Sequence, residues 1–188
     1  MHGLKITDEE RTVLTQFQEL MARMRRIQGV INLPLGSSVR LRLGADYQKR
    51  DGTLNNISGI GPAKLNDVEY YAWRGSLVVD LSDDIENYTI VSYLNSDHIG
   101  TQPQLYRGNP FTSFGNLALP QINRMKASSD PYQVETTLSN PQSITKQFQA
   151  INTTTWQVSD TLTLKNILSY ATFRQGLRQS VFGSNFQL

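Results

Sequence analysis

The feature that most constrains this chain is an alternation of apolar and polar residues that begins near Gly29. In 38–50 and in 68–81 every second residue is apolar, which is the period of a β-strand with one apolar face. Three further stretches are strand-like in composition, and a short one precedes them all: 86–97, 147–158, 161–174 and about 30–33. The facing of 86–97 stays open, because both of its alternate sets contain apolar residues. We therefore predict an all-β region at 29–188, an antiparallel meander of about six strands.

The connections between these stretches alternate in length. Tight turns are predicted at 34–37, 82–84 and 159–160, and long links at 51–66 and 98–146. In an antiparallel meander this order brings all the long links to one end. Transmembrane β-barrels have this asymmetry, with short periplasmic turns and long external loops. The predicted strands are also long enough to cross a bilayer, for which a tilted strand needs about 9–11 residues. The sequence therefore favours part of a transmembrane β-barrel.

Aromatic residues gather near the ends of the predicted strands. Eight lie toward the long links: Tyr47, Tyr70, Tyr71, Trp73, Tyr93, Phe148, Tyr170 and Phe173. Tyr88 and Trp156 lie beside the tight turns. Rings at both rims are typical of a strand that meets two lipid–water interfaces. The mean hydropathy of −0.39 fits a wall with only one lipid-facing side. The alternative is a soluble β-sandwich, in which the same rings would form cross-strand pairs.

Residues 1–28 have a different pattern. Thr7 and Glu10 fit a capping box, and apolar residues then recur at steps of three and four as far as Ile27. This predicts one amphipathic α-helix at 1–28, a segment that is not native to a barrel. No stretch reaches the roughly 18 consecutive apolar residues of a membrane-spanning helix. The acidic residues Asp8 and Glu9 stand where a secretory signal needs an apolar core, so no signal peptide is expected.

Composition excludes several classes of function. The chain has no cysteine and two histidines, which excludes thiolate chemistry and a multi-histidine metal site. Its formal net charge of +2 is too small for a nucleic-acid footprint. About 60 of the 188 residues are Ser, Thr, Asn or Gln, far more than the charged residues. We expect no enzyme, no cofactor and no metal site.

A few residues qualify as weak candidates for a binding site. Arg40, Arg42 and Arg74 share the polar side of their strands and would face the lumen of a barrel, where positive charge favours an anionic ligand. The competing interpretation is that they only hydrate the wall. His98 is expected to be a solvated loop residue, and Asp83 with Asp84 an ordinary turn rather than a catalytic pair. The Gly59–Gly61 segment lacks the Lys-Ser/Thr of a phosphate loop.

Three segments resemble the barrel of a TonB-dependent outer-membrane receptor. They are VINLPLGSSVRLRLGADYQKRDG at 30–52, NDVEYYAWRGSLVVDLSDDIENYTIVSYLNSD at 66–97 and VSDTLTLKNILSY at 158–170. The resemblance implies a segment of a 22-stranded barrel in the outer membrane. It further implies active uptake of a scarce nutrient, such as a ferric siderophore, cobalamin or a glycan. The implied partners are outer-membrane lipid, the nutrient, and the TonB energy-coupling complex, which acts through a plug domain.

The chain departs from that family in two ways. Neither the plug nor the energy-coupling box is recognisable in 1–29. Six strands also cannot close even an eight-stranded barrel, so their edges would stay unpaired. We therefore expect a fragment that is not competent for transport alone, with residues 1–27 in place of the true upstream region. The alternative function is a soluble β-sandwich binding module with a helical self-association arm.

Overall fold

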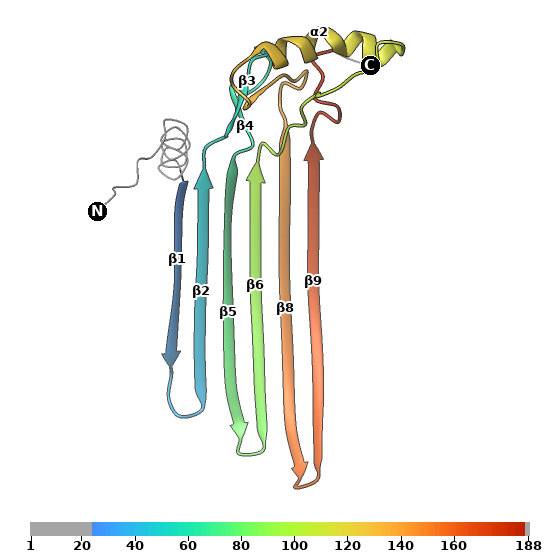
Figure 1. Cartoon of the computed structure of the whole chain (residues 1–188). Coiled ribbons are helices and arrows are strands. Elements are labelled where there is room, and N and C mark those ends of the chain that lie inside the picture. The colour runs from blue at the N-terminus through green and yellow to red at the C-terminus, as the bar shows by residue number, and fades with distance from the viewer. Residues whose placement is uncertain (1–23, 187–188) are drawn as a thin grey trace, which may run out of the picture.

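The computed structural model describes residues 24–186, and its main element is one open antiparallel sheet of six strands. The strands lie side by side in chain order, as Figure 1 shows. Their bounds are β1 Met24–Pro34, β2 Val39–Arg50, β5 Val68–Ser82, β6 Ile85–His98, β8 Gln142–Ser159 and β9 Leu162–Arg178. The predicted antiparallel meander of six strands is therefore confirmed. The sheet is not closed, since β1 and β9 each keep one unpaired edge within the described part of the chain.

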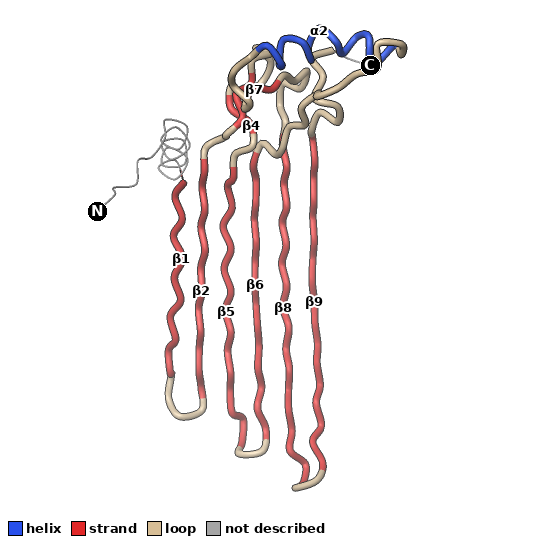
Figure 2. Tube along the Cα trace, viewed as in Figure 1, coloured by secondary structure: helices blue, strands red, loops and turns tan. Residues whose placement is uncertain are grey.

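The predicted asymmetry of the connections is confirmed as well. Tight turns join β1 to β2, β5 to β6 and β8 to β9 at one end of the sheet (Figure 2). The long connections 51–67 and 99–141 lie at the opposite end, together with the segment 179–186. We call these three segments the cap. All the irregular structure of the sheet is therefore gathered beyond one set of strand ends.

The predicted N-terminal helix is wrong at its C-terminal end. Met24–Gln28 belong to β1, so the expected boundary between residues 28 and 29 falls inside a strand. The rest of the helix prediction, 1–23, lies outside the described residues. The helical spacing there competes with a period of two. Pairing with β2 decides between them, because it aligns Ile27 with Tyr47 and sets Arg26 beside Asp46 in an ion pair of 2.7 Å.

The prediction that the chain is all β after residue 29 is also wrong, because the cap contains helix α2, Ser113–Ala127. The hydroxyl of Thr112 caps it by accepting from the Gly115 N–H at 3.1 Å. One face of the helix is buried at helical spacing, through Gly115, Ala118, Gln121, Ile122 and Met125. Pro120 lies inside the helix and removes one backbone donor, which hides the helix from a reading of the sequence.

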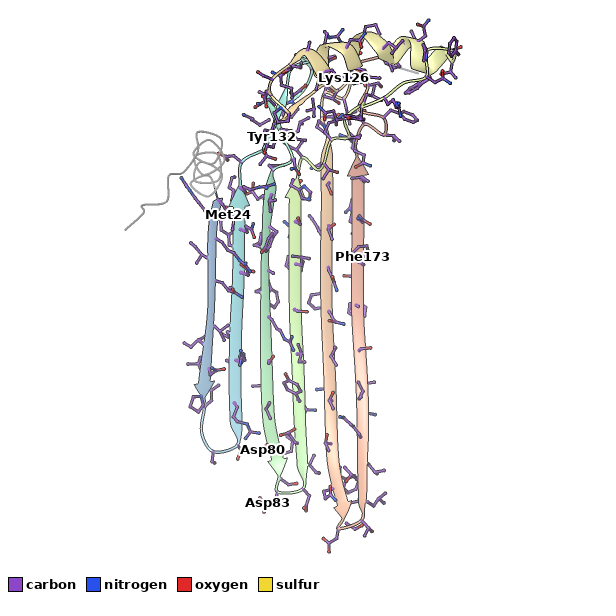
Figure 3. The ribbon with its side chains drawn as sticks, viewed as in Figure 1. Met24, Asp80, Asp83, Lys126, Tyr132 and Phe173 are labelled. Atoms are coloured by element: carbon purple, nitrogen blue, oxygen red, sulfur yellow. The ribbon has the colours of Figure 1, made fainter. Side chains whose placement is uncertain are left out.

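The cap also has its own small sheet and the compact core of the structure. The sheet has the order β4-β3-β7, from Lys64–Leu65, Leu54–Asn56 and Gln133–Val134. The buried hydrophobic side chains of the described residues all lie in the cap: Leu65, Ala118, Ile122, Met125 and Val134. The six-stranded sheet, by contrast, carries side chains on both faces, and nothing in residues 24–186 forms a second layer over either (Figure 3). Every residue of β9 is exposed.

Candidate functional site

The strand register sorts the side chains of the sheet onto two different faces. Residues paired across neighbouring strands share a face, so the odd positions of β1, β2 and β5 lie together. We call this the apolar face; its members include Ile27, Ile31, Leu33, Leu41, Leu43, Tyr47, Tyr71, Trp73, Leu77 and Val79. The opposite side, which we call the polar face, carries Arg26, Gln28, Asn32, Arg40, Arg42, Asp46, Gln48, Arg74 and Ser76.

The register also resolves the facing of 86–97. Tyr93 pairs with Trp73 and Phe148, so the set of β6 residues that includes Val91 and Tyr93 lies on the apolar face. The other set, with Ile90 and Leu94, lies on the polar face. Each set of β6 contains both apolar and polar side chains. The sequence of β6 alone therefore does not distinguish its two faces.

Aromatic rings form a band across the apolar face near the cap. The ring centroids of Tyr93 lie 6.0 Å from Tyr71 and 6.1 Å from Trp73, and those of Phe148 and Tyr170 are 6.2 Å apart. At the tight-turn end, Trp156 shares this face and pairs with Ile85 of β6. Six of the eight rings predicted toward the long links, and one of the two predicted beside the tight turns, therefore share the apolar face. Three of the rings, however, lie on the polar face instead: Tyr70, Tyr88 and Phe173.

Ion pairs hold part of the polar face together. Arg40 donates to both carboxylate oxygens of Asp80, at 2.6 and 2.8 Å, and to Glu86 at 3.4 Å. Arg26 makes the same two-pronged contact with Asp46, whose carboxylate also accepts from the Tyr70 hydroxyl at 3.2 Å. Arg40 is therefore engaged within the sheet. Of the three predicted ligand candidates it is the one least free to meet a ligand.

The other two arginine candidates line one hollow in the polar face. The volume of this hollow is about 670 Å³, and Arg42 and Arg74 lie on its wall with Tyr88, Ser92 and Gln147. Within residues 24–186, neither arginine forms an ion pair. The lining also includes Asp46, whose carboxylate is bound by Arg26. The guanidinium groups of Arg42 and Arg74 suit an anionic group with several oxygen acceptors. The structure thus brings together two of the three arginines singled out in the sequence.

The cap is tied together by buried polar contacts that sequence reasoning missed. The Gln121 amide, only 2% exposed, donates to the Gly183 carbonyl at 2.7 Å and accepts from the Asn185 N–H at 2.9 Å. Arg124 donates to both oxygens of Glu135, a side chain that is almost fully buried. These contacts join segments far apart in the chain, so no local pattern signals them. Two local features do indicate helix α2 itself: the capping Thr112 and the helical spacing of its buried residues.

Close backbone approaches make the cap compact. A Cβ built on Gly61 would lie 2.7 Å from the Leu138 carbonyl oxygen, and one on Gly183 would lie 2.0 Å from that of Pro103. Both glycines also have a positive φ. Gly61 is therefore part of this packing, whereas a Cβ built on Gly59 would meet open space. The cap is therefore a packed unit beyond the strand ends, as Figure 1 shows.

The remaining sequence candidates show no chemical site. The His98 ring nitrogen Nδ1 accepts from the Gly100 N–H at 3.0 Å. Asp83 and Asp84 form the tight turn between β5 and β6, as Figure 3 shows for Asp83. In the part of the chain that the structure describes, no three His, Cys, Asp or Glu side chains are grouped so that they could hold a metal ion. Among the same residues, no helix has the length and apolar character needed to cross a membrane.

Comparison with protein families, with curated proteins and with solved structures gives no match to this chain.

Proposed function

We propose that this chain is a six-stranded piece of the outer-membrane barrel of a TonB-dependent receptor, not competent for transport alone. The resemblance of 30–52 and 66–97 to that family suggests it, and the open sheet supports it. In such a receptor the cap would lie outside the cell and the tight turns in the periplasm. The whole receptor would import a scarce nutrient, with energy delivered by the TonB complex through a plug domain.

The single observation that carries the proposal is a long, amphipathic sheet whose apolar face is covered by no other part of residues 24–186. Trp73 and Trp156 on that face are 44% and 45% exposed, and Ile27 is 73% exposed. A soluble protein rarely leaves so large an apolar surface in water, whereas lipid covers such a surface in a membrane. Strands of 11 to 18 residues are also long enough to cross the hydrocarbon, for which roughly 9–11 are needed.

The same argument assigns roles to the other parts of the sheet. The polar face would line the lumen, and the unpaired edges of β1 and β9 would pair with further strands of the barrel. Arg42 and Arg74, which line the same hollow in the polar face, are the residues that we expect to meet an anionic ligand on its way through the lumen. The cap would be the first part of the chain that a nutrient meets.

Two tryptophans make the membrane placement testable without labels. Trp73 and Trp156 are the only tryptophans of the chain, and they lie on the apolar face toward opposite ends of the sheet. The full chain is mixed with detergent and transferred to vesicles whose lipids carry bromine at shallow or at deep acyl positions. The variants Trp73→Phe and Trp156→Phe isolate one fluorophore each. We expect bromine to quench both residues, and shallow bromine more strongly than deep bromine.

The alternative function gives the opposite result. In a soluble β-sandwich the apolar face would pack against a second layer and away from lipid. The chain would then stay monodisperse without detergent, and brominated vesicles would leave both tryptophans unquenched. That pair of results would overturn the membrane proposal and favour the binding module.

A further inference from the structure

Four uncharged polar side chains interrupt the apolar face where β6 meets β8. Asn87 and Thr89 on β6 pair with Thr154 and Asn152 on β8. The amide of Asn87 donates to Asn152 Oδ1 at 3.2 Å, and the amide of Asn152 donates back to Asn87 Oδ1 at 2.9 Å. We call these four residues the amide cluster. At its centre, the side-chain amides of Asn87 and Asn152 donate to each other, in addition to the backbone pairing of the two strands.

The hydroxyl groups complete the amide cluster. Asn87 also donates to Thr154 Oγ1 at 2.8 Å, and Asn152 donates to Thr89 Oγ1 at 2.7 Å. The Thr89 hydroxyl donates to Asn87 Oδ1 at 3.2 Å. Both amide groups therefore use both N–H donors inside the cluster. A network with no unpaired amide donor is tolerated in an apolar environment, which matters here if the face meets lipid as proposed above.

The amide cluster lies at a strand pair whose register has no local determinant. Tight turns join the pairs β1–β2, β5–β6 and β8–β9, and a tight turn sets the register of its hairpin. The strands β6 and β8 are joined only through 99–141, and a connection of that length leaves the register free. The other pair with a long link, β2–β5, also has specific cross-strand contacts, including Lys49 to Glu69 at 3.0 Å.

Alternation of apolar and polar residues does not fix this register by itself. A slip of one residue would exchange the two faces of β8, but a slip of two residues would keep every side chain on its face. In one direction, a two-residue slip would set Asn152 opposite Val91 and Asn87 opposite Trp156. In the other, Thr89 would face Ala150, but Asn87 and Asn152 would lie directly opposite each other. The first slip therefore separates the two asparagines and leaves their amide donors beside apolar side chains, whereas the second keeps them side by side and is not opposed by their amide pair.

We propose that the amide cluster holds the native register of the β6–β8 pairing against the two-residue slip that would set Asn152 opposite Val91. The chain has no cysteine, so engineered disulfides can report the register directly. Ser92 and Gln149 are register partners on the polar face, away from the cluster. The pair Ser92→Cys with Gln149→Cys reports the native register, and Ser92→Cys with Ile151→Cys reports a slip of two residues.

The test compares the two disulfides in the full chain with and without the amide pair. In the parent chain we expect the native disulfide to dominate. In the double variant Asn87→Leu, Asn152→Leu we expect the ratio of slipped to native disulfide to rise roughly tenfold. The matched control is Thr153→Leu, Thr155→Leu, two β8 threonines on the polar face, which should leave the ratio unchanged.

A second disulfide separates loss of register from loss of folding. Ala72→Cys with Leu94→Cys joins β5 to β6, whose register a tight turn sets. This disulfide should form equally well in the parent and in the double variant. The proposal is overturned if the slipped ratio stays constant, and equally if the β5–β6 disulfide is lost as well. Because the assay reads strand pairing in micelles or in buffer, failure of the membrane proposal would leave its result intact.

Discussion

Replacing Gln121 with leucine should release the C-terminal segment 179–186 from helix α2. The Gln121 side chain is 2% exposed, and its amide holds the Gly183 carbonyl and the Asn185 N–H. Leucine has a similar size but leaves both backbone groups without their partner. A hydrogen bond contributes about 1 kcal/mol net, so the loss of two lowers the free energy of local opening by about 2 kcal/mol. That corresponds to a roughly 30-fold larger open population.

Hydrogen exchange of the full chain measures this opening directly. In the Gln121→Leu variant, the Asn185 amide should exchange roughly 30-fold faster, while amides in the middle of β2 should keep their rates. The control is Gln104→Leu, because Gln104 donates to the Gln133 carbonyl at 2.9 Å from an exposed position. Equal exchange of Asn185 in the parent and in the Gln121 variant would refute the reasoning. So would an equal effect of the Gln104 control.

Two further substitutions test the faces of the sheet and the packing of the cap. Leu77→Arg puts a charge on the apolar face and should lower the free energy of unfolding in vesicles by roughly 2–4 kcal/mol. Val78→Arg, on the polar face, should lower it by less than about 1 kcal/mol. Equal losses in denaturant titrations would contradict the assignment of the faces. Gly183→Ala brings a Cβ against Pro103 at a positive φ, so limited proteolysis should cut 179–186 several-fold faster than in the parent; an unchanged cutting rate would contradict the described backbone approach.

Local chemistry predicts the strands of the sheet well. The predicted strand 38–50 agrees with β2 to within one residue, because alternation extends over its whole length and a tight turn precedes it. The predictions for 68–81 and 86–97 match β5 and β6 equally closely. The predicted strand 147–158 is shorter than β8, which begins at Gln142, since the polar residues at its start pair without alternating.

The failures of prediction lie where two local patterns compete. Residues 24–28 fit an amphipathic helix as well as a strand, and only pairing with β2 selects the strand. Pro120 and the glycine- and asparagine-rich flanks of α2 hide a helix that is stabilised by Glu135 and Gly183, which are distant in the sequence. Of the candidate site, the sequence identified Arg40, Arg42 and Arg74, but it could not show that Asp80 engages the first of them.

The sequence by itself determined the six strands of the main sheet, their order along the meander and the end at which the long connections gather, but not the three short strands of the cap. These follow from residue spacing and from turn chemistry, which act over a few residues. Only the tertiary structure decided which side of β6 belongs to the apolar face, which arginines stay uncompensated, and how the cap closes on its own core. Those outcomes depend on register and on contacts between distant segments. A one-residue shift in strand pairing moves every side chain of the strand to the opposite face of the sheet, and no local sequence pattern determines that pairing.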